Sequence, residues 1–424
     1  MATVNTVLGP VDAKALGFTL MHEHLIASSA GIPHTFPELV DRKEAIAGGV
    51  KALKEAAAEG LGTYVDVTTM GLGRDVTVLR AVAEQVGVHI IAATGIWLDI
   101  PRAIANSLTA DQLAQLFVRE IEVGIEGTGI KAGVIKVATA QEGVTPANEV
   151  VLRAAARASN FTGVPITTHT VATARVGEAQ MAIFLEERVD PRRVCIGHSN
   201  DTTDVDYLAG LARQGCVLGM DHYPGGRGGS LNWEERTQVV KRLVDMGLAD
   251  RVSFSHDYLI ARLASPEVNE QQRASNPDGI CFVSRRVLPR LRELGVSEAA
   301  IRAMTVEAPR RFFGGSRHPD AASGCTHAGE DSVGGSLQAL ANVVAMGSIA
   351  SHPRVGFPTH PELRSAGQAL HPHSRESLAA RSGCSAVASL LDVWVYFPCH
   401  ADRWTYSRSH LHRHRLHAAP AHQH

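Results

Sequence analysis

Residues 17–24 read GFTLMHEH, an apolar run that ends in two histidines two positions apart. If this run is a β-strand, alternate side chains lie on the same face, so His22 and His24 project in one direction. Two imidazoles on one face at the end of a strand can bind one metal ion. Glu23 projects the other way, and no chemistry is assigned to it. A single His-x-His is a weak motif, so the stretch predicts a metal site only if the rest of the chain supplies further ligands.

From Gly17 to about Gly315 the chain repeats one pattern, in which a short apolar segment precedes an amphipathic one. The apolar segments are rich in Val, Ile and Thr, which is typical of strands buried on both faces. The expected strands are 18–22, 63–69, 89–95, 133–139, 166–170, 194–199, 217–222 and 252–257. The segments between them have helical spacing and composition. The expected helices are 43–59, 76–85, 110–126, 148–159, 178–187, 204–214, 233–246, 285–293 and 297–313, with Thr109 and Ser297 as N-caps.

Strands that alternate with helices in this way predict an α/β fold, a closed (β/α)8 TIM barrel. The alternative is an open doubly wound sheet. That fold commonly carries a glycine-rich nucleotide fingerprint after its first strand. Gly71-Leu72-Gly73 lacks the third glycine of such a fingerprint, so it is interpreted as a tight turn.

The composition excludes several classes of protein. The chain has 424 residues, of which 45% are hydrophobic and 20% charged, as in soluble globular proteins. A formal net charge of -2 gives no indication of a nucleic-acid or membrane-surface partner. We find no apolar run of the ~20 residues that a membrane helix needs, and no signal-peptide pattern at the N-terminus. The six cysteines form no C-x-x-C pair, so we expect a cytoplasmic protein with reduced thiols.

The composition changes after residue 315. Eight of the 21 histidines precede that point and the rest follow it, among many Ser, Arg, Ala, Pro and Gly residues. We therefore divide the chain into a barrel, 1–315, and a low-complexity tail, 316–424, which is expected to be disordered. An artefactual extension is the alternative. The histidines of the tail have no metal-site spacing, so metal binding there is not favoured.

In a barrel of this kind, catalytic residues lie at the carboxyl ends of the strands. The expected strands end in a recurring set of polar side chains, namely His22 and His24, His169, His198, Asp221-His222 and His256-Asp257, and Lys136 lies inside the fourth strand. Each has an ordinary explanation when taken alone, such as a hydrogen-bonded core histidine or a helix cap. Lys136 is the exception, because a buried ammonium is costly unless it has a partner, a lowered pKa or a carbamate modification.

Taken together, these ligands exceed what one ion requires. Two divalent ions about 3.5–4 Å apart would use the set, with a carbamylated Lys136 between them and room for a shared hydroxide. Zn, Co and Mn are all compatible with these ligand types.

Several stretches, in the same order along the chain, resemble those of one known family. They are Thr19–His24, Ala92–Trp97, Gly129–Lys136, Thr167–Thr170, Ile196–Ser199, Ser255–Asp257, Asn276–Gly279 and Ala308–Phe312. Over residues 4–314 the chain resembles the phosphotriesterase family of the amidohydrolase superfamily, which includes organophosphate hydrolases and phosphotriesterase-like lactonases.

The resemblance implies the role of each ligand. His22, His24 and Asp257 would hold the more buried ion, and His169 and His198 the more exposed one. Lys136, as its carbamate, would bridge the two ions together with a hydroxide that attacks phosphorus or a carbonyl carbon. Asp257, His222 and Asp201 would then carry the proton away, in that order.

The resemblance is less specific about the substrate. Trp97 would line the leaving-group pocket, although it could equally be core packing. Tyr223, Tyr258 and Arg262 are candidates for the pocket wall, with loop packing or a solvated charge as the alternative. The leading hypothesis is an enzyme that hydrolyses organophosphate triesters. The alternatives are a lactonase on the same site, or a barrel that binds metal or a ligand without turnover. The expected partner is a small-molecule substrate, and the resemblance makes a homodimer an expectation as well.

Overall fold

The computed structural model of the chain describes residues 2–226 and 230–315. The predicted tail, 316–424, lies outside the described residues, and so does part of the glycine-rich loop after Tyr223. The division of the chain at residue 315 stays a prediction.

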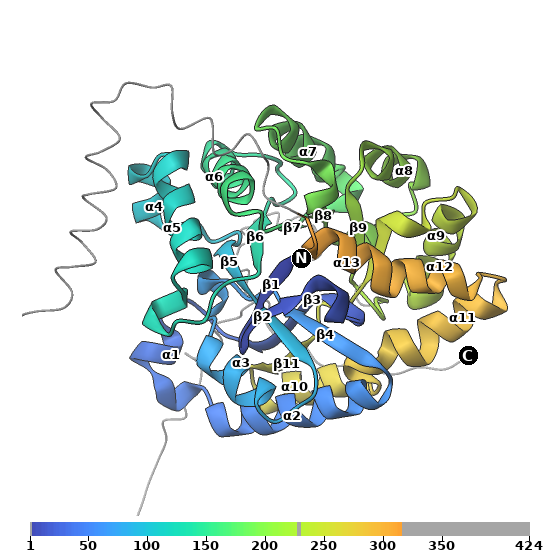
Figure 1. The fold of residues 1–424 in the computed structure, drawn as a ribbon. Helices are drawn as coiled ribbons and strands as arrows, with labels where there is room; N and C mark the ends of the chain where they lie inside the picture. Colours follow the sequence, from blue (N-terminus) through green and yellow to red (C-terminus); the bar gives the residue numbers. More distant parts are fainter. Residues whose placement is uncertain (1, 227–229, 316–424) are drawn as a thin grey trace, which may run out of the picture. The chain divides into compact units, whose positions relative to one another are not determined.

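Eight parallel strands stand side by side in chain order and curl into the predicted (β/α)8 barrel, with the helices packed around them (Figure 1). They are β3 (Phe18–Ala27), β4 (Leu61–Asp66), β5 (His89–Ile96), β6 (Val134–Ala138), β7 (Ile166–His169), β8 (Val194–Ile196), β9 (Val217–Met220) and β10 (Val252–Phe254). A further strand, β11 (Leu259–Arg262), was not predicted and pairs in parallel with the outer part of β3.

The barrel is closed between its first and last strands by single contacts rather than by a continuous ladder. The amide of Asp257 donates to the carbonyl of His22 at 3.1 Å, and the amide of His24 donates to the carbonyl of Tyr258 at 3.1 Å. Since β11 follows directly and pairs with β3, the segment after β10 is held against β3 along its whole length.

Each predicted helix corresponds to described helical structure, whereas α1, α4 and α10 were not predicted. They are α1 (Ile32–Thr35), α2 (Arg42–Ala58), α3 (Val76–Ala83), α4 (Arg102–Ser107), α5 (Ala110–Glu122), α6 (Pro146–Thr162), α7 (Val176–Glu186), α8 (Val205–Gln214), α9 (Trp233–Asp245), α10 (Pro266–Ser275), α11 (Leu288–Glu293), α12 (Glu298–Arg302) and α13 (Ala308–Phe313). Thr109 and Ser297 are N-caps as predicted, each accepting a hydrogen bond from the amide three residues on.

Two helix predictions need correction. The segment predicted as 110–126 ends as a helix at Glu122, because Gly124 has a φ of 141°, which no helix allows. The segment predicted as 297–313 is split by a π-helical turn, Ala303–Glu307. The segment predicted as 285–293 is helical throughout in spite of Pro289, since a π-helical turn, Val283–Val287, runs directly into α11.

One end of the barrel interior is filled with apolar side chains. One buried cluster inside the barrel contains Met21, Val65, Ile91, Val134 and Val217. A hairpin that was not predicted, β1 (Thr3–Thr6) and β2 (Gly9–Asp12), packs across this end. Its Asn5 side chain donates to the carbonyl of Ala132 at 3.0 Å, just before β6. The residues predicted as metal ligands lie at the other, carboxyl ends of the strands.

Among the described residues, no helix has the length and apolar character to cross a membrane. Cys195, Cys216 and Cys281 are buried, and none of these three is in a disulfide.

Candidate metal centre and active site

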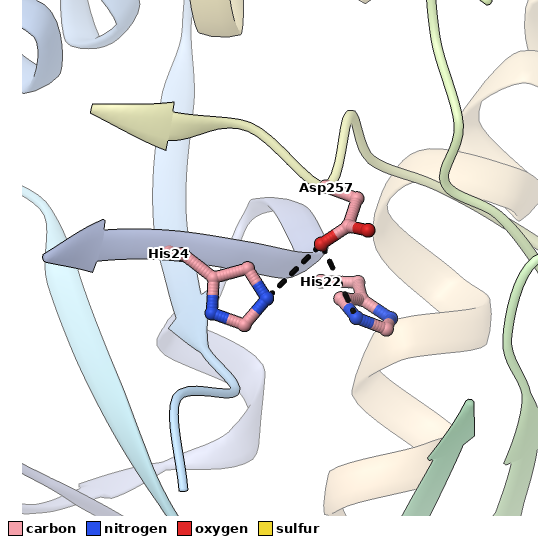
Figure 2. Close-up of side chains that lie close together, drawn as sticks. All are labelled: His22, His24 and Asp257. Carbon is pink, nitrogen blue, oxygen red and sulfur yellow. Dashed lines mark ion pairs between the residues drawn. The ribbon is translucent and has the colours of Figure 1, made fainter. Parts of the chain in front are cut away.

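The two histidines of β3 and the aspartate after β10 converge on one point (Figure 2). Asp257 Oδ1 lies 3.0 Å from His24 Nε2 and 3.7 Å from His22 Nε2. The pairing of β3 with β4 shifts register between Leu20 and Glu23. Such an irregularity re-aims side chains, and here Met21 belongs to the apolar interior while the neighbouring His22 faces the polar site.

Lys136 of β6 and two histidines complete the group. Lys136 is 1% exposed, and its Nζ lies 2.9 Å from His22 Nε2. His169, at the end of β7, faces His198, just after β8, with 2.6 Å between His169 Nδ1 and His198 Nε2. The ring centroids of His22 and His198 are 4.9 Å apart, so the two histidine pairs adjoin. All six predicted ligand residues meet at the carboxyl ends of the strands.

The outer nitrogens of the histidines are held by partners that sequence reasoning missed. Thr68 Oγ1 lies 2.8 Å from His24 Nδ1. Asp221 reaches two histidines at once, with Oδ2 3.0 Å from His22 Nδ1 and Oδ1 2.9 Å from His198 Nδ1. Histidines that bind metals are oriented in this way by a carboxylate or another hydrogen-bonding group on the far nitrogen. Asp221 thus links a histidine of each pair, although the sequence indicated only that it ends the seventh strand.

The donor set fits divalent metal. The potential ligand atoms of His22, His24 and Asp257 all lie within 4.8 Å of one another. Burial, followed by the charge of Lys136, lowers the pKa of His22 to about 3. Burial also lowers the pKa of His169 and of His198. Low pKa values favour the neutral imidazole, which is the form that binds metal.

The environment of Lys136 lowers the pKa of its amine, so the neutral form is more accessible than in an ordinary lysine. Burial lowers its pKa to about 8, although the nearby carboxylates of Asp257 and Asp221 oppose this shift. A neutral amine is the form that can combine with CO2 to give a carbamate. The predicted modification of Lys136 is therefore chemically reasonable at this position.

A chain of hydrogen bonds leads from the ligand group to Asp201. His222 Nε2 lies 3.0 Å from Asp257 Oδ2, and His222 Nδ1 lies 2.7 Å from Asp201 Oδ2. Burial alone would lower the pKa of His222, but Asp201 and Asp257 raise it well above the usual value. Arg236 in turn donates to the other oxygen of Asp201. Asp257, His222 and Asp201 therefore form the connected carboxylate–imidazole–carboxylate series that a proton relay requires.

Two residues of the site have unusual backbone conformations. His198 has a φ of 57° and Asp257 a φ of 50°. Residues with a side chain rarely adopt this left-handed region, and those that do are concentrated at functional sites.

The predicted pocket residues occupy different environments. Trp97 follows β5 and is half-buried, and its ring makes a T-shaped contact with the ring of His169 at a centroid distance of 5.9 Å. Tyr223 is only 2% exposed and packs against Phe254 in the core. Tyr258 is half-buried, and Arg262 Nε donates to Asn269 Oδ1 at 3.2 Å. The roles of these residues as pocket wall stay predictions. The burial of Tyr223 argues against such a role for Tyr223.

A model of the phosphotriesterase family matches residues 2–313. The chain belongs to the phosphotriesterase family. It is 40% identical to a phosphotriesterase homology protein of Mycobacterium tuberculosis over 323 residues, which cover 74% of this chain and 98% of the relative.

Two other relatives carry names that specify a reaction. An aryldialkylphosphatase of Saccharolobus solfataricus is 36% identical, with 72% of this chain and 96% of the relative covered. An N-acetyltaurine hydrolase of Bos taurus is 27% identical, with 73% of this chain and 97% of the relative covered. The family assignment confirms the resemblance and identifies the chain as a hydrolase, whose residues include His and Asp groups able to bind metal.

Proposed function

We propose that this phosphotriesterase-family protein hydrolyses organophosphate triesters with two divalent ions at the carboxyl ends of its barrel strands. The observation that carries the proposal is the coincidence of two features. The ligand group is complete, and one of its members, Asp257, is also the first residue of a hydrogen-bonded series through His222 to Asp201. The similarity to a relative named aryldialkylphosphatase supports phosphotriesters as the substrate class.

Each ligand has an assigned place in this proposal. His22, His24 and Asp257 would hold one ion, His169 and His198 would hold the other, and Lys136, as its carbamate, would serve both. Zinc is the metal we expect, and cobalt and manganese are compatible with the same ligands. When bound, such ions lower the pKa of water and polarise the oxygen of a P=O or C=O group.

The protein side chains manage the proton. Asp257 accepts the proton of the attacking water, and His222 stabilises that transfer through its bond to Asp257 Oδ2. Asp201 holds the other nitrogen of the imidazole, so its ring stays oriented toward Asp257. Trp97, whose ring lies against His169, is placed to contact the leaving group.

A lactone or another carboxyl ester is the second candidate substrate class, because Ser255-His256-Asp257-Tyr258 is similar to the lactonases. The relative named N-acetyltaurine hydrolase likewise indicates that attack at a carbonyl carbon occurs on related chains. Binding of metal or a ligand without turnover is the third reading. The homodimer and the cytoplasmic location remain expectations.

A substrate panel tests the proposal. The protein is purified with added Zn or Co and assayed with an aryl dialkyl phosphate, an acyl homoserine lactone and a δ-lactone. Preferred turnover of the phosphate supports the proposal, whereas preferred turnover of a lactone supports the second candidate. Two bound ions per chain without turnover of any substrate would favour the binding-only reading.

Reconstitution of the metal-free protein should depend on pH through Lys136. Its pKa is lowered to about 8, so the neutral amine grows from a few per cent at about pH 6.5 to most of the population at about pH 8.5. At fixed dissolved CO2, recovery of activity on addition of Zn should therefore be faster at the higher pH. Removal of CO2 should slow it at both. Recovery that is independent of CO2 would contradict the carbamate.

Truncation after Gly315 should leave metal content and turnover at the level of the full chain. All of the proposed ligands and relay residues precede that position, and the family match ends at residue 313. The check is elemental analysis and turnover of the two purified forms. A truncated protein that folds but loses its metal would overturn the prediction.

A further inference from the structure

We infer that Glu23, which lies between the two histidine ligands of β3, is a positioning residue that holds Asp257 in its ligating conformation. The inference rests on the proposed metal site. It concerns a residue for which the sequence indicated no chemistry.

The carboxylate of Glu23 is fully buried and accepts four hydrogen bonds from the segment that follows β10. Its Oε1 accepts from the Ser255 hydroxyl at 2.9 Å, and from the amide and Nδ1 of His256 at 2.9 and 2.6 Å. Its Oε2 accepts from the amide of Tyr258 at 3.0 Å. β10 ends at Phe254, so residues 255–258 are held by single backbone bonds, such as that from the Ser255 amide to the Met220 carbonyl at 3.1 Å, together with the Glu23 carboxylate.

All four partners are donors. The Ser255 oxygen already accepts from the amide of His22 at 2.8 Å, so its hydrogen is directed to Glu23. His256 Nε2 accepts from the amide of Val283 at 3.0 Å, so Nδ1 carries the hydrogen. The ring of His256 is thereby turned away from the metal ligands with which its place in the sequence had grouped it. A side chain that accepts on both oxygens suits this site, whereas an amide would place an N–H against at least one donor.

Two of the three residues bound by Glu23, His256 and Tyr258, flank Asp257. The amide of Asp257 itself donates to the carbonyl of His22 at 3.1 Å. Three successive amides, 256 to 258, are thus anchored to two residues of β3, and Asp257 between them is kept at a φ of 50°. This conformation is costly for a residue with a side chain and persists only when its surroundings enforce it.

Anchoring at Glu23 fixes the spacing of three ligands. His22 and His24 adjoin Glu23 in the chain, so the bonds that hold residues 256 and 258 also set the place of the Asp257 carboxylate relative to both imidazoles. The observed result is a distance of 3.0 Å from Asp257 Oδ1 to His24 Nε2. Without the anchor, the aspartate would relax toward an ordinary backbone conformation and the ligand set would open.

The test compares Glu23→Gln with a control carboxylate. Metal-free protein is titrated with Zn in competition with a chromophoric chelator, and the Co form is examined by visible absorption. We expect about 10- to 100-fold weaker Zn affinity, the range found when groups that orient metal ligands are removed, and an altered Co spectrum. Glu120→Gln is the control, because Glu120 accepts from Arg74 and Thr94 in the same barrel without contacting a ligand. It should lower the melting temperature but leave Zn affinity unchanged.

Ser255→Ala provides a second variant, because it removes the hydroxyl donor to Glu23 and, with it, the acceptor of the His22 amide, so both bonds through which Ser255 ties the segment after β10 to β3 are lost. Weakened Zn affinity in folded Ser255→Ala supports the inference even where Glu23→Gln is insoluble. Wild-type affinity and a wild-type Co spectrum in the folded variants would overturn it, and so would an equal loss of affinity in Glu120→Gln. A wild-type protein that binds both ions but hydrolyses no ester contradicts the proposed function alone, whereas one that binds no metal contradicts both.

Discussion

Replacement of Lys136 by alanine should reduce the bound metal from about two ions per chain to fewer than about one, and abolish most turnover. The amine lies 2.9 Å from His22 Nε2, between the two histidine pairs, and is 1% exposed. In the proposed site its carbamate would be the one protein ligand shared by both ions, so its removal should weaken both positions at once. Alanine also leaves a cavity next to the remaining ligands, which therefore lose part of their mutual support.

The measurement is elemental analysis of the purified variant, with turnover and melting temperature on the same preparation. Lys131→Ala is the matched control, because Lys131 lies five positions upstream and is exposed. It should match the wild type in all three measurements. Retention of both ions in Lys136→Ala would show that the bridging role is wrong, whatever the effect on turnover.

Replacement of His222 by asparagine should lower turnover by about 10²- to 10⁴-fold, which is the usual contribution of general acid–base catalysis, while both ions remain bound. His222 contacts Asp257 through Nε2 and Asp201 through Nδ1, and it holds no proposed ion itself. Asp257→Asn should cost turnover and metal together, because Asp257 is both ligand and proton acceptor. Comparison of the two variants separates the relay from ligation.

The pH–rate profile gives a second readout. Asp201 and Asp257 raise the pKa of His222 well above its usual value. The turnover of the wild type should therefore change over the pH range in which His222 loses its proton, and this change should be missing from the profile of His222→Asn. His89→Asn is the control, since His89 begins β5 at the opposite end of the barrel from the ligands. A folded His222→Asn protein with wild-type turnover would remove His222 from the mechanism.

The strand–helix order of the barrel was predictable because strands buried on both faces are nearly continuous apolar runs, as in 89–95 and 133–139. Its edges were not. β3 continues to Ala27 beyond the predicted end at His22, because β11 pairs with it at His24, Ile26 and Ala27. The pairing partner lies more than 200 residues away in the chain, so no local pattern indicates it.

The candidate ligands were predictable for a related reason. Parallel strands bring their carboxyl ends to one side of a barrel, so polar residues at those ends, such as His169 and Asp257, are brought together by topology alone. The groups that orient them were not predictable. Asp221 could have faced many partners, and its contact with His22 and His198 depends on side-chain directions that arise only when β3, β8 and β9 are assembled.

Residues 17–24 contain one feature that the sequence alone determines and one that only the tertiary structure decides. Its alternation determined by itself that His22 and His24 share a direction and that Glu23 does not, since successive side chains of a strand project to opposite sides. What Glu23 does was decided by tertiary structure. Its side chain meets the segment after β10 only because the barrel closes there, and in that buried position each donor of residues 255–258 required an acceptor.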